Sequence, residues 1–294
     1  MEYYIQFMIN GLITGSIYAV VAAGFSLIYN THKFVHFAHG AVVMVGGYLF
    51  HTFFLLEWNI IVAALMAAMV TGGLALGLYQ LTYAVFYKKR AGNVILLMAS
   101  IALLLLINNV LQLFYGAQAT VVKAFPVTEG LEFWGAIITP VQIIIIAVSL
   151  ILLGLLYILM TYTQLGKMMR AVADNDELSL IIGIPRDNVK RFSFFIGSFI
   201  GALGGVLVSL QEALVPSRGT YLIIKGFTGA VIGGIESVPA SIIGSYLLGF
   251  IENISIIYLP SDYKITISFG LLFLFLIFSP GGLYALFFKD RVSK

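Results

Sequence analysis

The chain contains no cysteine, which excludes disulfide bonds, thiolate metal ligands and cysteine nucleophiles. Charge is also scarce, because Asp, Glu, Lys and Arg make up 10% of the residues, whereas soluble domains carry about 25%. The net charge of +3, without a basic patch that alternates with aromatic residues, argues against nucleic-acid binding. The sequence also lacks G-x-x-x-x-G-K-[ST], H-E-x-x-H and G-x-S-x-G, so it offers no phosphate-binding loop, zinc-protease helix or serine-hydrolase elbow.

The chain instead consists largely of long apolar segments. Hydrophobic residues make up 61% of the sequence, more than a soluble fold of this size could bury. A helix needs about 20 apolar residues to cross a bilayer, and backbone in hydrocarbon must be helical to satisfy its own hydrogen bonds. We therefore predict an all-α polytopic membrane protein with one transmembrane domain, residues 1–294. The predicted spans are Tyr4–Tyr29, Gly40–Leu56, Ile60–Phe86, Val94–Phe114, Thr139–Met160, Phe192–Leu210, Ser237–Leu259 and Ile265–Ser279.

A ninth apolar stretch, Tyr221–Ile235, is short and rich in glycine. Its Gly229, Gly233 and Gly234, with Pro239 just beyond, are typical of a broken helix that lines a cavity near the membrane midplane. Small residues spaced by four are equally typical of close helix packing. The stretch either crosses the membrane or enters it and returns, so the predicted number of spans is eight to nine.

Positive charges predict the orientation, because short cytoplasmic loops carry an excess of Lys and Arg. Clusters occur at Lys88–Arg90, at Lys167–Arg191 and from Lys289 onward, and the span count puts all three on the side of Lys33. That side then holds twelve of the 16 positive residues. We predict an external N-terminus, retained as part of a first span, and a cytoplasmic C-terminus. The C-terminal part of this prediction fails if Tyr221–Ile235 does not cross.

The most polar segment between two spans is Thr161–Arg191, which holds nine charged residues. We call residues 162–191 the polar insert. The segment from Gly166 to Gly183 includes a helical stretch, with its apolar positions at Met168, Val172, Leu178 and Ile182. Such a helix could fit a groove on a partner protein. Gly183 would permit the turn that ends it, and Pro185 would stop its continuation. We interpret the polar insert as a cytoplasmic docking loop for a separate motor protein.

Three histidines offer the sharpest enzymatic alternative. His32, His36 and His39 are spaced four and three apart, so they would share one face of a helix and could supply three metal ligands. Only His51 adds to them, and no nearby carboxylate would orient the imidazoles. We therefore favour polar positions at the cytoplasmic end between the first two spans over a membrane metalloenzyme.

Ionisable and amide side chains inside predicted spans are candidates for a translocation path. Glu252 is the strongest of them, and Asn10, Asn108 and Asn109 are further candidates. The alternative role is hydrogen bonding between helices, worth about 0.6 kcal/mol on average. The sequence has no chain of acidic residues that would form a proton relay, which argues against a proton-driven carrier.

Four ordered blocks of the sequence resemble one known family. They are GSIYAVVAAGFSLIYNTHKFVHFAHGAVVMVGGY with its Phe37-Ala38-His39-Gly40 element, RAVADNDELSLIIGIPRDNVKR, GAVIGGIESVPASIIGSYLLGFIEN, and Ser279-Pro-Gly-Gly-Leu283. Over essentially its whole length the chain resembles the membrane permease subunits of branched-chain amino-acid ABC importers. One departure stands out, because ABC importers often carry Glu-Ala-Ala before the glycine of their docking loop. Asp176-Glu177-Leu178-Ser179 occupies that region here.

The resemblance implies a transport subunit of a prokaryotic cell membrane, without enzymatic activity or a cofactor of its own. It implies as partners two cytoplasmic ABC ATPases, a second related permease and an external substrate-binding protein. It also implies branched-chain or related amino acids as substrates. A self-contained secondary transporter or channel for small polar solutes is the alternative.

The expected site residues fall into two sets. The residues expected to contact the ATPase are Gly166, Arg170, Ala171, Asp176, Glu177, Gly183, Ile184 and Pro185. The residues expected to line the translocation path are Asn10, Tyr18, Phe37, His39, Gly40, Asn108, Asn109, Gly229, Gly233, Gly234 and Glu252.

Overall fold

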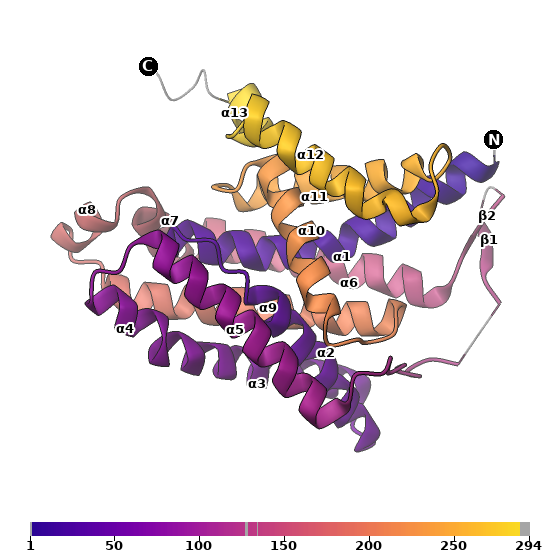
Figure 1. Ribbon diagram of the computed structural model, residues 1–294, viewed down its shortest axis with the longest axis horizontal. Coiled ribbons are helices and arrows are strands. Elements are labelled where there is room, and N and C mark those ends of the chain that lie inside the picture. The colour runs from indigo at the N-terminus through magenta and orange to yellow at the C-terminus, as the bar shows by residue number, and fades with distance from the viewer. Residues whose placement is uncertain (1, 127–128, 134, 289–294) are drawn as a thin grey trace.

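The computed structural model describes residues 2–126, 129–133 and 135–288, and these residues are mostly helical (Figure 1). The helices are α1 (Glu2–His32), α2 (His39–Leu55), α3 (Ile60–Leu81), α4 (Tyr83–Lys88), α5 (Asn93–Tyr115), α6 (Pro140–Tyr162), α7 (Gln164–Asp174), α8 (Asp176–Ile181), α9 (Arg186–Gln211), α10 (Arg218–Gly233), α11 (Val238–Ser255), the 3₁₀ turn η1 (Ser261–Tyr263), α12 (Lys264–Phe278) and α13 (Gly282–Phe288). Strands β1 (Leu131–Phe133) and β2 (Ala136–Ile138) form a small antiparallel hairpin, with Leu131 opposite Ile138.

The helices confirm the prediction of an all-α polytopic membrane protein. Within the described residues, six segments are long and apolar enough to cross a membrane: Tyr4–His32, Ile60–Lys88, Asn93–Tyr115, Pro140–Tyr162, Arg186–Gln211 and Ser261–Ala285. The remaining predicted spans correspond to α2, which is apolar but has 17 residues, and to α10 and α11, which form a pair bent by 114°. The predicted basic cluster from Lys289 onward lies outside the described residues.

Helices α1 and α9 form the centre of the bundle. In their most apolar windows, 83% of the α1 residues and 78% of the α9 residues are buried, against 22% for α6 and 11% for α12. The two central helices approach closely, since a Cβ atom built on Gly24 would lie 2.5 Å from the carbonyl oxygen of Gly197. Helices α6 and α12 therefore lie at the periphery of the described chain.

Helix α2 packs against α9 with almost no space between the two backbones. A Cβ atom on Gly205 would lie 1.8 Å from the carbonyl oxygen of Val43, and one on Gly46 would lie 2.5 Å from the Cα atom of Ala202. Both distances are far inside van der Waals contact. The glycines of these helices thus let backbones meet directly, which confirms the close packing that the small-residue spacing predicts.

The long axis of the molecule separates two ends (Figure 1). One, which we call the insert end, carries α7, α8 and α13. The other, the hairpin end, carries the N-terminus of α1 and the β1–β2 hairpin, and there the side chain of Gln6 accepts a hydrogen bond from the backbone of Ile137 at 2.8 Å. Lys33, Lys88 and Arg191 line one cavity at the insert end. The basic residues before α2 and at the end of α4 therefore share an end with the polar insert, as predicted.

The glycine-rich stretch is broken at its end rather than within it. Helix α10 runs across the direction of α1, and α11 then runs along α1 (Figure 1). Gly234 joins the two with a φ of +128°, a conformation that side-chain-bearing residues rarely adopt. The break lies at the insert end, because Glu236 beside it forms an ion pair with Lys33 at 3.3 Å.

The contact between Gly205 and Val43 predicts a strong stability effect. Gly205→Val should lower stability by about 1–3 kcal/mol or more, because overpacking forces α2 away from α9. Thermal unfolding of the detergent-purified protein measures this. Gly73→Val is the matched control, because Gly73 is also helical and has nothing within 4 Å of its Cβ position. Equal melting temperatures for the two variants would refute the assignment of this contact.

Candidate functional site

The polar insert begins with a sharp turn between α6 and α7. The side chain of Thr163 accepts a hydrogen bond from the backbone of Gly166 at 3.0 Å and so caps α7. A Cβ atom on Gly166 would lie 2.2 Å from the carbonyl oxygen of Leu159 in α6. Gly166 therefore packs against the preceding helix and has a role in the turn, whereas its contact with an ATPase stays a prediction.

The predicted helix from Gly166 to Gly183 is two helices instead of one. Asn175 adopts an extended conformation, and its side chain accepts a hydrogen bond from the backbone of Leu178 at 2.9 Å. Asparagine favours such a capping position over a helix interior, so the chain ends α7 and starts α8 here. The prediction of a single continuous helix was therefore wrong.

The end of α8 follows the predicted turn at Gly183. Gly183 has a φ of +81°, its N–H donates to the carbonyl of Leu180 at 3.0 Å, and the N–H of Ile184 donates to the carbonyl of Ser179 at 2.9 Å. This pair of bonds is a Schellman motif, which favours glycine at the left-handed position. Pro185 then precedes the first residue of α9. The turn and stop predicted for Gly183 and Pro185 are confirmed.

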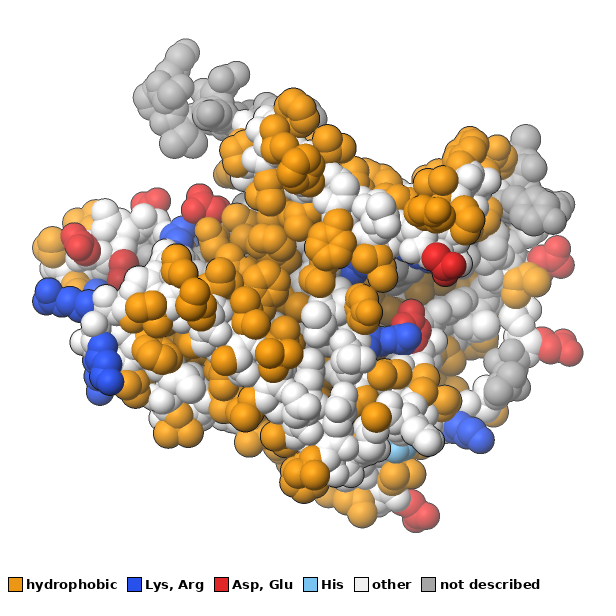
Figure 2. All heavy atoms as spheres, viewed as in Figure 1, with side chains coloured by type: hydrophobic (Ala, Val, Ile, Leu, Met, Phe, Trp, Pro, Cys, Tyr) orange, Lys and Arg blue, Asp and Glu red, His pale blue; other side chains and the backbone are white. Residues whose placement is uncertain are grey.

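Helix α8 carries an exposed hydrophobic surface. Its members, which we call the α8 patch, are Leu178, Leu180, Ile181 and Ile182, with exposed fractions of 52%, 48%, 80% and 64%. By contrast, Met169 and Val172 of α7 are buried against the bundle. The apolar positions predicted for one helix thus face in different directions, and those of α8 project from the tip of the insert end. Figure 2 shows hydrophobic side chains among charged ones at this tip.

An acidic residue holds α8 onto the start of α9. Asp176 accepts a hydrogen bond from Lys190 at 2.9 Å and one from Arg186 at 3.3 Å. The side chain of Ile184 packs against the hydrophobic core. Asp176 and Ile184 therefore attach the α8 patch to the bundle. Among the other expected docking residues, Ala171 is half-buried, whereas Arg170, Glu177, Gly183 and Pro185 are exposed.

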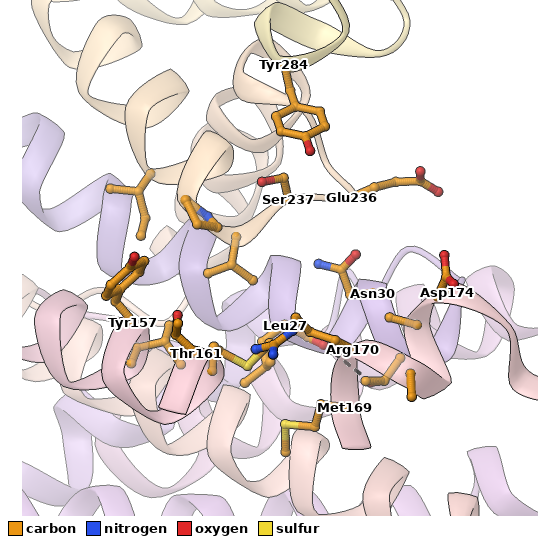
Figure 3. A pocket seen from close by; sticks show the side chains of 18 of the residues that line it. Leu27, Asn30, Tyr157, Thr161, Met169, Arg170, Asp174, Glu236, Ser237 and Tyr284 are labelled. Carbon is orange, nitrogen blue, oxygen red and sulfur yellow. Dashed lines mark hydrogen bonds between the residues drawn. The ribbon is translucent and has the colours of Figure 1, made fainter. Parts of the chain in front are cut away.

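A cavity of about 710 Å³, the insert-end pocket, separates the polar insert from the C-terminal helices. Its wall comes from the ends of α1 and α6, from α7, from the break between α10 and α11, and from α13. Figure 3 shows Tyr284, Ser237 and Glu236 on one side of this pocket and Leu27, Arg170 and Asp174 on the other. The polar insert is thus joined to the bundle mainly through α6, α9 and the end of α1, and the C-terminal helices face it across open space.

A buried cluster of polar residues joins α1, α10, α11 and α12. Glu252 of α11 is fully buried and accepts hydrogen bonds from Lys225, Ser268 and Tyr18, the last at 3.1 Å. Lys225 also donates to Ser268 at 2.6 Å and to the carbonyl oxygen of Lys264 at 3.3 Å. Both charges are thereby paired and hydrogen-bonded, as a buried ion pair in hydrocarbon requires.

The sequence pointed to part of this cluster. Glu252 and Tyr18, both expected at the translocation path, are in direct contact. Lys225 was not among the expected path residues, although a lysine inside the apolar stretch Tyr221–Ile235 is itself a sign of a functional position. Ser268 gave no sequence signal, because serine is common in membrane helices at packing positions.

The other expected path residues lie in several separate places. Asn10 accepts a hydrogen bond from Gln6 at 3.2 Å near the hairpin end. Asn108 is buried and donates to Thr220 of α10 at 3.4 Å, whereas the neighbouring Asn109 is exposed and donates to the carbonyl of Leu105 in its own helix at 2.7 Å. The two neighbouring asparagines of α5 thus face in different directions.

The remaining expected path residues pack between helices. Around the start of α2, Phe37 contacts Phe227, with ring centroids 5.9 Å apart, His39 lies against Gly24 and Gly201, and Gly40 lies against Gly219. At the contact between α10 and α11, Gly229 lies against Ser245 and Gly233 against Ala240, whereas Gly234 lies against Gly281, just before α13. The residues expected at the translocation path therefore lie at close contacts between helices, and they do not line one continuous path.

The three histidines do not share one face of a helix. His32 ends α1, His36 shares a hydrogen bond with the hydroxyl of Tyr83 at 3.0 Å, and His39 begins α2. Among the described residues, no group of three or more His, Cys, Asp or Glu side chains could hold a metal ion. All three imidazoles are buried among aromatic and small residues instead.

Six helices of membrane-spanning length within the described residues, close backbone contacts at glycines and a buried ion pair between helices are the features of a multi-pass membrane protein. The chain belongs to the family described as "Branched-chain amino acid transport system / permease component", whose model matches residues 7–276. This membership favours a permease subunit over a secondary transporter or channel.

Individual relatives match nearly the whole chain. It is 31% identical over 297 residues to the high-affinity branched-chain amino acid transport system permease protein BraD of Pseudomonas aeruginosa, covering 96% of this chain and 95% of BraD. It is also 31% identical over 300 residues to the LivH permease protein of Escherichia coli, with the same coverages of 96% and 95%. The solved structure of PsaBC from Streptococcus pneumoniae in complex with Fab matches with a TM-score of 0.52 at 12% identity, covering 96% of this chain and 95% of that one, which shows a shared fold.

The buried ion pair predicts a specific mutational pattern. Lys225→Met should lower stability by about 3–5 kcal/mol, because it leaves Glu252 buried without its counter-ion. The double variant Lys225→Met with Glu252→Gln should be more stable than the single variant, with a coupling energy of about 0.5–3 kcal/mol. Thermal unfolding in detergent measures both. Lys264→Met is the control, because Lys264 lies nearby but donates to Asn253. Additive effects would show that the pair is not coupled.

Proposed function

We propose that this chain is the permease subunit of an ATP-driven importer in a prokaryotic cell membrane, and that it carries branched-chain or related amino acids. The observation that carries the proposal is the family match over residues 7–276. The names of BraD and LivH, which specify branched-chain amino acids, support the substrate class. Within this proposal the permease itself performs no covalent chemistry, and separate ATPase subunits hydrolyse ATP.

The α8 patch is the proposed contact with an ATPase. Its hydrophobic side chains project from the most polar part of the chain, where exposure to water is unfavourable unless a partner covers them. The ion pairs of Asp176 with Lys190 and Arg186 fix the patch to α9, one of the two central helices. A force applied at the patch would therefore pass directly to α9 and to the helices that pack on it.

The proposed orientation places the insert end in the cytoplasm. Lys33, Lys88 and the basic residues of the polar insert lie at this end, which agrees with the excess of positive charge expected in cytoplasmic loops. The N-terminus and the β1–β2 hairpin then lie outside, where a substrate-binding protein would dock. A second permease of the same kind would complete the path, and two ATPases would drive its alternation between two states.

The docking role makes a direct prediction. Ile181→Glu should reduce co-purification of the ATPase subunit and ATP-dependent amino-acid uptake by about tenfold or more, because a buried charge without a partner costs several kcal/mol at the contact. Gly183→Trp should have the same effect, since its φ of +81° disfavours any side chain. Affinity capture of the reconstituted complex and uptake into proteoliposomes measure the two effects.

The matched control is Val121→Glu, which makes the same change at another exposed aliphatic residue, in the segment that follows α5 at the hairpin end. It should leave ATPase capture unchanged. If Ile181→Glu and Val121→Glu captured equal amounts of the ATPase, the α8 patch would not be part of the ATPase interface.

The orientation has its own test, for which a chain without cysteine is well suited. A single cysteine at Ile181 should react with a membrane-impermeant maleimide only after the cells are opened, whereas one at Val121 should react in intact cells. Both positions are exposed, with exposed fractions of 80% and 62%, so reactivity reports the side of the membrane. Labelling of the Ile181 cysteine in intact cells would reverse the proposed orientation.

A further inference from the structure

A second cavity, the hairpin-end pocket, has a volume of about 680 Å³ and lies between α1, the end of α9, α10 and the start of α12. It lies on the hairpin-end side of the ion pair between Lys225 and Glu252, and Lys225 forms part of its wall. Figure 2 shows acidic and basic side chains meeting in a hollow below α12. This pocket takes no part in the ATPase contact described above.

The walls of the hairpin-end pocket suit an aliphatic side chain. One face of α10 supplies Leu222 between Arg218 and Lys225, which are two helical turns apart. Ile13 and Ile17 of α1 line the pocket as well. Ligand pockets typically combine such apolar walls with a few fixed polar groups.

The charges around the pocket are separated but balanced. Its basic residues are Arg218, Lys225 and Lys264, and its acidic residues are Glu212 and Asp262, both exposed. Glu252 supplies the third negative charge from behind Lys225. The formal charges of these six side chains cancel. A neutral ligand with one positive and one negative group would meet a partner for each, whereas a purely cationic or anionic ligand would match only one of the two sets of charges.

Arg218 is placed to take part in recognition. It forms an ion pair with Glu212 and donates to the carbonyl oxygen of Ala213 at 3.1 Å, and within the described chain both bonds come from Nη1. The remainder of its guanidinium group can therefore meet a carboxylate in the two-point geometry that arginine favours. Lys225 is 7% exposed and held by Glu252 and Ser268, so its charge is fixed in position.

We propose that the hairpin-end pocket binds one aliphatic amino acid in its zwitterionic form. The α-carboxylate lies toward Arg218 and Lys225, the α-ammonium toward Glu212 and Asp262, and the side chain against Leu222 and the isoleucines of α1. The site rests on the proposed function in one respect, since it would receive the amino acid that the importer carries.

The test uses the assembled transporter in lipid nanodiscs without its binding protein, and saturation-transfer NMR with three probes. The probes are L-leucine, 3-methylbutylamine, which lacks the carboxylate, and 4-methylpentanoate, which lacks the ammonium group. Leucine should bind at least about tenfold more tightly than either analogue, because each analogue leaves a charged group of the site without a partner. Equal signals from all three probes would overturn the proposal.

Variants of Arg218 test whether this residue takes part in leucine binding. Arg218→Gln should weaken leucine binding about tenfold or more, Arg218→Lys should restore part of it, and Lys123→Gln, another exposed basic residue near the hairpin end, should leave it unchanged. Should Arg218→Gln fail to assemble, Leu222→Trp tests the site by filling the pocket. Unchanged binding in the assembled variant overturns the proposal.

The same preparation tests the proposed binding site and the proposed function independently. Reconstituted with the binding protein and ATP, the wild-type complex should take up leucine. Uptake without leucine binding in the pocket would overturn the site alone. The absence of ATP-dependent uptake, with leucine still bound, would overturn the proposed function and leave the site standing.

Discussion

The whole fold depends on backbones that touch each other directly. Gly24 of α1 meets Gly197 of α9, and Gly205 of α9 meets Val43 of α2, at distances that leave no room for a methyl group. In a membrane, apolar side chains gain little by leaving lipid for protein, so close van der Waals contact has to hold helices together. Glycine makes that contact possible here, and α1 and α9 become a rigid centre to which the functional elements attach.

The peripheral helix α12 is attached by a different kind of interaction. Helix α12 buries one described side chain, Ser268, and its most apolar window is 11% buried. Ser268 joins the ion pair of Lys225 with Glu252. A charged network, rather than apolar packing, therefore anchors this helix to α10 and α11. Such a network is directional, so it fixes the position of α12 while the outer face of the helix remains exposed.

The sequence predicted what depends on local chemistry. Apolar length predicted the spans, and the turn at Gly183 and the stop at Pro185 followed from the conformations that glycine and proline favour. The break at Asn175 was missed because a mid-helix asparagine and a capping asparagine look alike in a periodic pattern. The pairing of Lys225 with Glu252 was missed for another reason, since it needs α10 to cross the bundle and α11 to return along α1. The spread of the expected path residues has the same origin, because contacts between distant helices leave no periodic signal in one chain.

Helix α10 lies between the two pockets. Its first residue, Arg218, lies in the hairpin-end pocket, and Glu236, just beyond its last turn, lies in the insert-end pocket and pairs with Lys33. A helix of 16 residues spans about 24 Å and behaves as a rigid rod. A displacement of Glu236 would reach Arg218 and Lys225 only through Gly234, the left-handed residue that joins Glu236 to the end of the helix. Ser26 of α1 accepts a hydrogen bond from Ser241 and donates one to the carbonyl oxygen of Ile235, so α1 holds both the break and the start of α11 in place.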